Sequence, residues 1–135
     1  MADKFLYEEL DAVSKMGFLK REIPYYLKNN LNLNFELRPY QEEAFARFFH
    51  CLDNEFPGKE WPLHFLFNMA TGSGKTLIMA GLILYLYEKG YRNFLFFVNS
   101  TNIIENTKDN FLNPQSSKFL FAENIRFGTK RVAVT

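Results

Sequence analysis

Residues 69–76 read Met69-Ala70-Thr71-Gly72-Ser73-Gly74-Lys75-Thr76, and this stretch decides the fold class of the chain. It fits the pattern of a phosphate-binding loop except at its first position, where Met69 stands in place of glycine. Gly72 and Gly74 let the backbone turn successive N–H groups toward phosphate oxygens. We expect Lys75 to reach the β- and γ-phosphates and the Thr76 hydroxyl to bind Mg²⁺. The pattern therefore predicts an ATP and Mg²⁺ site made by Thr71, Gly72, Ser73, Gly74, Lys75 and Thr76, with Lys75 and Thr76 as the catalytic candidates.

The loop lies between two short apolar runs, Leu63-His64-Phe65-Leu66-Phe67 and Phe94-Leu95-Phe96-Phe97-Val98. Such runs are expected of strands covered on both faces in a parallel sheet, and residues 76–89 between them predict a helix closed by Gly90. A right-handed strand-helix-strand crossover would place the loop at the carboxyl edge of the sheet. The expected fold class is therefore α/β, with a parallel sheet flanked by helices. The alternative, a glycine-rich turn with a merely solvated Lys75, is disfavoured by this context.

Apolar spacing, proline and glycine predict the remaining elements. Helices are expected over residues 4–16, just after Pro24, over about 39–52 and over about 103–111. Residues 125–134 predict a hairpin around Gly128-Thr129-Lys130. We expect an N-terminal helical accessory segment over residues 1–34 and the first part of an ATP-binding domain over residues 35–135.

Composition excludes several classes of protein. The chain of 135 residues is 47% hydrophobic, which is enough for one sizeable core, and its net charge of +1 gives no long-range attraction for DNA. Cys51 has no cysteine to pair with, and together with His50 and His64 it cannot complete a metal cage. We expect Cys51 to be an inert core residue.

The same composition predicts a reducing, cytoplasmic setting without a membrane. The N-terminus lacks the uninterrupted apolar core of a signal peptide. The longest apolar run, from Leu77 to Tyr87, is about half of the ~20 residues that a membrane-spanning helix needs.

A second segment, Phe35-Glu36-Leu37-Arg38-Pro39-Tyr40-Gln41, places an arginine, two aromatic rings and an amide where a helix begins. The Gln41 amide could donate to N7 and accept from N6 of adenine, while Arg38 or an aromatic ring covers the base. Alternatively, Pro39 only starts the helix and the rings form a hydrophobic lid. The residues alone leave both interpretations open.

Together, Phe-x-Leu-Arg-Pro-Tyr-Gln and Met-Ala-Thr-Gly-Ser-Gly-Lys-Thr resemble the glutamine motif and motif I of superfamily 2 helicases. The form is most similar to the type III restriction (Res) subunit, whose version of motif I agrees with Met69. Phe97-Val98-Asn99-Ser100-Thr101 resembles motif Ia, which implies a nucleic-acid backbone contact by Asn99, Ser100 and Thr101. These three residues would serve equally well as the N-cap of the following helix. The resemblance spans residues 23–112.

The resemblance implies a RecA-like P-loop NTPase lobe of an ATP-driven restriction motor that translocates along DNA. It further implies an ATP hydrolase whose partners are DNA and a modification methyltransferase. The acidic pair and arginine finger of the family do not occur in this sequence, so we expect a piece of a longer protein that binds nucleotide without useful turnover.

Two other classes of protein stay open. A P-loop kinase or small GTPase shares the phosphate loop, and a preference for adenine over guanine would separate it from the helicase class. A nucleotide-independent interaction module would be recognised by a titration with nucleotide and Mg²⁺.

Overall fold

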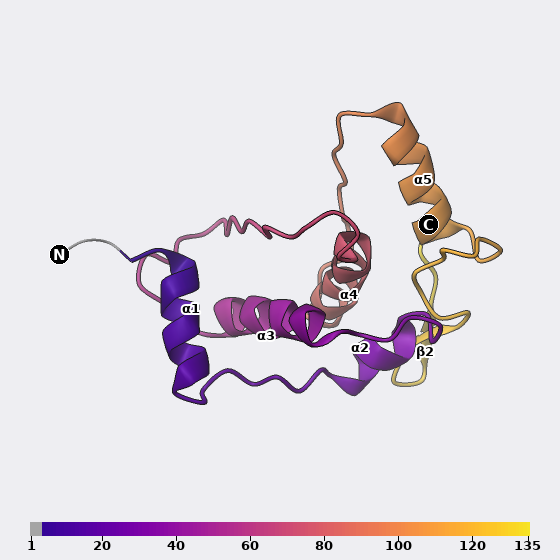
Figure 1. The fold of residues 1–135 in the computed structure, drawn as a ribbon. Helices are drawn as coiled ribbons and strands as arrows, with labels where there is room; N and C mark the ends of the chain where they lie inside the picture. Colours follow the sequence, from indigo (N-terminus) through magenta and orange to yellow (C-terminus); the bar gives the residue numbers. More distant parts are fainter. Residues whose placement is uncertain (1–3) are drawn as a thin grey trace. The chain divides into compact units, whose positions relative to one another are not determined.

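The structure is a computed structural model that describes residues 4–135 (Figure 1). Residues 1–3, on which the predicted accessory segment begins, lie outside the described residues. The chain divides into two compact units, each made from two separate stretches of sequence. The first holds residues 4–23 and Arg38–Met69, and the second holds Pro24–Leu37 and Ala70–Thr135. The domain boundary expected at residue 34 is not decided by this division and stays a prediction.

The first unit contains the helices α1 (Leu6–Lys15) and α3 (Pro39–Asp53), both near their predicted ranges. An ion-pair network joins them, because the Arg47 guanidinium lies 2.6 Å from Asp11 Oδ1 and 2.8 Å from Glu43 Oε1. Burial alone would lower the pKa of Arg47, but the hydrogen bonds to these two carboxylates outweigh it and raise the pKa. The buried apolar side chains of the unit are Leu10, Leu19, Ile23, Phe45, Ala46, Phe49 and Cys51.

Cys51 is one of these core residues, as predicted. Its side chain is 2% exposed, and burial raises the pKa of its thiol, although the charge of Lys59 opposes the rise. A thiol that is buried and stays protonated is a poor nucleophile. Lys59 itself closes the end of α3, since its ammonium donates to the Leu52 and Asn54 carbonyls.

The apolar run at residues 63–67 also belongs to the first unit, and it packs against α3. Its residues alternate between half-buried and exposed, as an extended backbone requires when one face is covered. The rings of Phe65 and Phe67 lie with their centroids 5.7 and 6.1 Å from that of Phe48, whereas Leu66 between them is 92% exposed. The run is therefore covered on one face only.

The second unit is built around α4 (Lys75–Glu88), with α2 (Tyr25–Asn30), α5 (Thr101–Leu112) and the strands β1 (Ile125–Phe127) and β2 (Lys130–Val132). The α4 helix is apolar nearly all round, as expected of a helix buried among other elements. Its buried residues are Leu77, Ile78, Ala80, Gly81, Leu84 and Tyr85. α2 contacts both α4 and β1, and these three elements form the centre of the unit.

The segment that follows α2 is tied to the chain before the hairpin. The Asn32 N–H donates to the Leu120 carbonyl at 2.9 Å, and the Ala122 N–H donates to the Asn30 carbonyl at 2.8 Å. Leu31 and Phe121 form an antiparallel bridge between these bonds, and Phe121 is 1% exposed. Two segments far apart in the sequence are thereby held together as a short β-type ladder.

The predicted parallel sheet is not formed among residues 4–135, and this expectation is corrected. Residues 63–67 and 94–98 carry no strand, and the sheet that is described consists of β1 and β2 in antiparallel pairing. The two runs belong to different units. A strand is defined by hydrogen bonds to a neighbouring chain segment, so an apolar run forms no sheet until such a neighbour pairs with it. The predicted helices and the hairpin are confirmed.

Candidate nucleotide-binding site

The phosphate loop has the backbone geometry that its glycines predict. Gly72 has φ +80° and Gly74 has φ +84°, both in the left-handed region that residues with a Cβ rarely enter. Gly74 is the N-cap of α4, which begins at Lys75, so the loop opens directly into a helix N-terminus. That is the arrangement in which backbone N–H groups and the helix dipole favour an anion.

The Lys75 side chain lies across its own loop. Its ammonium donates to the Ala70 carbonyl at 3.2 Å, and the same carbonyl accepts from the Ser73 N–H at 3.2 Å. Lys75 is exposed, and a phosphate would be a stronger partner for its charge than a neutral carbonyl. Thr71 and Gly72 are exposed, whereas Thr76 is half-buried in the first turn of α4.

Gln41 has a structural role that its sequence position did not suggest to us. Its side chain is 4% exposed, and its Oε1 accepts from the Arg38 N–H at 2.9 Å. Gln41 lies three residues after the N-cap Arg38, so this bond is the reciprocal half of a capping box. The spacing from the N-cap position to a glutamine at N3, with Pro39 at N1, was the signal that could have predicted it.

The cap also bears on the adenine interpretation of Gln41. The carbonyl oxygen that would accept from adenine N6 already accepts from the Arg38 N–H, so it would have to serve both donors or exchange them. Arg38 is exposed and starts α3. Both residues belong to the first unit, and Thr71 to Thr76 belong to the second. A nucleotide site shared by these residues therefore stays a prediction.

The three residues expected to contact nucleic acid lie at the start of α5. Ser100 holds the N-cap position, and its carbonyl accepts from the Ile104 N–H at 3.1 Å. Its side chain makes no capping hydrogen bond to any residue from 4 to 135. Asn99 and Thr101 are exposed, so their polar groups are accessible. Their contact with nucleic acid stays a prediction.

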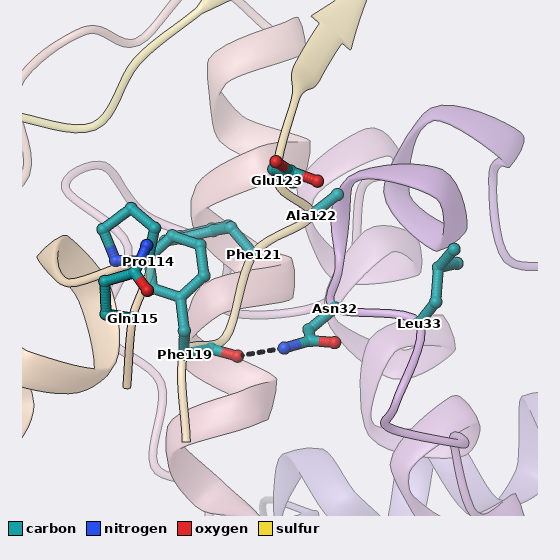
Figure 2. Close-up of a pocket in the computed structure, with 8 residues that line it drawn as sticks. All are labelled: Asn32, Leu33, Pro114, Gln115, Phe119, Phe121, Ala122 and Glu123. Carbon is teal, nitrogen blue, oxygen red and sulfur yellow. Dashed lines mark hydrogen bonds between the residues drawn. The ribbon is translucent and has the colours of Figure 1, made fainter. Parts of the chain in front are cut away.

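A cavity of about 310 Å³ lies elsewhere in the second unit (Figure 2). Its walls come from the segment after α2 and from the chain between α5 and β1. The Asn32 side chain donates to the Phe119 carbonyl at 2.7 Å and holds these two segments together. No residue of the phosphate loop lines it, and its sequence carried no signal that we recognised. The lining residues are Asn32, Leu33, Pro114, Gln115, Phe119, Phe121, Ala122 and Glu123.

Metal-binding clusters and membrane-spanning helices are both absent from the described part of the chain. Among residues 4–135, no three His, Cys, Asp or Glu side chains gather closely enough to hold a metal ion. None of the described helices combines the length and the apolar character needed to cross a membrane.

Comparison with known proteins agrees with the motifs. Residues 34–133 match the family model described as type III restriction enzyme, res subunit. Over 103 residues the chain is 50% identical to the "Probable type III restriction-modification enzyme HindVIP Res subunit" of Haemophilus influenzae. The match covers 72% of this chain and 20% of that protein, so the chain spans about a fifth of its relative. No solved structure matches the chain. The chain belongs to the family of type III restriction enzyme Res subunits.

Proposed function

We propose that this chain is the ATP-binding part of an ATP-dependent DNA translocase of a type III restriction system. The observation that carries the proposal is the phosphate loop, in which two left-handed glycines lead into the N-terminus of α4 and Lys75 lies across the loop. Its occurrence in a chain of the Res family supports ATP as the ligand. It also supports a function in which ATP hydrolysis is coupled to movement along DNA.

The residues have separate tasks in this proposal. Backbone N–H groups from Thr71 to Gly74 surround the phosphates, the Lys75 ammonium leaves the Ala70 carbonyl for the β- and γ-phosphates, and the Thr76 hydroxyl binds Mg²⁺. Gln41 and Arg38 contact the adenine from the start of α3. The Mg²⁺ and the backbone donors would neutralise charge on the phosphates.

The wider setting of the protein forms part of the same proposal. The protein moves along DNA, which Asn99, Ser100 and Thr101 contact. A modification methyltransferase is the partner subunit. The site of action is the cytoplasm. The whole protein would hydrolyse ATP.

Titration calorimetry with ATP and Mg²⁺ tests the proposal on the chain as it is. We expect weak binding that Lys75→Ala largely removes and that Lys118→Ala, an exposed lysine beyond α5, leaves unchanged. Equal affinity for the wild type and for Lys75→Ala would overturn the phosphate-loop assignment. A preference for GTP over ATP would instead favour a GTPase-type site.

Turnover gives a second test. We expect negligible phosphate release from this chain, because the sequence holds neither the acidic pair nor the arginine finger that would stabilise phosphoryl transfer. Steady release at ~1 s⁻¹, which lies within the usual range of enzymes, would contradict that expectation.

A further inference from the structure

The β1–β2 hairpin places two arginines directly opposite each other. Its register pairs Ile125 with Val132, Arg126 with Arg131, and Phe127 with Lys130. Side chains alternate along a strand, so Arg126 and Arg131 share one face, and both are exposed. Ile125 is buried and Phe127 half-buried on the other face.

A buried amide holds this pair in place. The Asn30 side chain, 2% exposed, donates to the Arg126 carbonyl at 2.8 Å and accepts from the Arg126 N–H at 2.8 Å. Both backbone groups of Arg126 thus point away from β2, which makes Arg126 and Arg131 a non-hydrogen-bonded pair. In such pairs the side chains lie closest, with Cβ atoms about 4.5–5.5 Å apart.

Within residues 4–135, neither guanidinium forms an ion pair. The neighbouring acid Glu123 and Glu88 at the end of α4 make no salt bridge to them. Like charges directly opposite each other on a hairpin are unfavourable. The exposed Lys130 adds a third cation to the hairpin. An anion between the two arginines would relieve the repulsion.

The arginine pair is distinct from the phosphate loop. The Phe127 ring packs on Tyr87, with centroids 4.8 Å apart, so the hairpin is attached near the last turn of α4. Lys75 lies at the first turn of the same helix, about 18 Å away at 1.5 Å of rise per residue. One nucleotide bound at the loop therefore does not place its β- and γ-phosphates between the arginines.

We propose that Arg126 and Arg131 form a contact for the phosphate backbone of double-stranded DNA. A guanidinium binds phosphate in a bidentate manner, and two of them side by side suit successive phosphates of one strand. The face of the hairpin that carries Arg126 and Arg131 presents charge without apolar groups. The centre of a protein–protein interface is depleted in charged residues, so this face fits a nucleic acid better than a protein partner. The choice of DNA as the polyanion rests on the proposed function.

Fluorescence anisotropy with a short labelled DNA duplex tests this contact. We compare the wild type, Arg126→Gln/Arg131→Gln and a control, Lys15→Gln/Lys20→Gln, which removes the same two charges from exposed sites in the first unit. We expect the arginine variant to lose roughly tenfold or more in affinity at about 0.1 M salt. Its slope of log affinity against log salt should flatten by about 2, because about one counterion is released per phosphate contact. Arg126→Lys/Arg131→Lys should keep most of the slope.

Three results would overturn the contact: equal DNA binding by the wild type and the arginine variant, an equal loss in the lysine control, or no DNA binding by the wild type. Displacement of the duplex by poly-L-glutamate as effective as displacement by unlabelled duplex at equal charge concentration would show that the arginines do not prefer phosphate to carboxylate, and would also overturn it. ATP titration of the same proteins separates the two proposals. An unchanged ATP affinity in the arginine variant is expected, whereas a wild type that binds DNA but no nucleotide would refute the proposed function alone.

Discussion

Two helices of this chain begin in opposite ways. At the start of α3, Pro39 has no N–H, and the buried Gln41 side chain binds the Arg38 N–H. At the start of α4, the N-cap is Gly74, which has no side chain with which to cap the helix. The first N–H groups of a helix need an external partner. Of these two starts, that of α4, left open because no side chain caps it, is therefore the one suited to an external anion.

The largest expected effect comes from removing the cation at the open start of α4. Lys75→Ala should weaken ATP binding by roughly 10- to 150-fold, because a hydrogen bond to a charged group contributes about 1.5–3 kcal/mol. Calorimetry measures the affinity, and urea unfolding should show little change, since Lys75 is exposed. A variant that binds ATP as the wild type does would show that the open start of α4 receives no phosphate.

The next effect concerns the backbone conformation of the same start. Gly74→Ala should lower the free energy of unfolding by about 1–2 kcal/mol, because a Cβ disfavours the left-handed conformation at φ +84°. The control is Ser117→Ala, which introduces the same side chain at an exposed position in the turn after α5 and should leave the stability nearly unchanged. Urea unfolding curves measure both variants. An undiminished stability in Gly74→Ala would mean that the loop takes another conformation.

The smallest effect distinguishes the two tasks assigned to Gln41. Gln41→Ala removes the cap of α3 and should cost about 1 kcal/mol in unfolding free energy. Gln41→Glu keeps an oxygen for the Arg38 N–H but loses the amide donor for adenine N7, so it should retain most of that stability and weaken ATP binding by roughly 5-fold or more. Thermal melts and paired nucleotide titrations measure the two properties. An unchanged ATP affinity in a folded Gln41→Glu protein would leave Gln41 with its capping task only.

The two apolar runs, 63–67 and 94–98, show where sequence patterns were insufficient. Both have the composition of a buried strand, yet Phe65 packs on α3 while Leu95 and Phe97 are each 85% exposed. Hydrophobicity favours burial wherever a surface is available, but it does not supply the neighbouring backbone that a strand needs.

Local chemistry was sufficient for the backbone of the phosphate loop, for the bounds of the described helices to within a few residues, and for the hairpin. Glycine at positions 72 and 74 requires only its own backbone freedom, and a helix requires hydrogen bonds between residues four apart. These properties were determined by the sequence itself, because every interacting group lies a few positions away along the chain.

Only the tertiary structure decided which distant groups meet. The amide of Asn30 binds the backbone of Arg126, 96 positions later, and so anchors β1 at the residue that pairs with Arg131. Burial of the Gln41 side chain likewise depends on what packs around α3. Such contacts depend on which distant segments of the chain pack together in the tertiary fold. The periodicity of a short window of sequence does not specify these pairings.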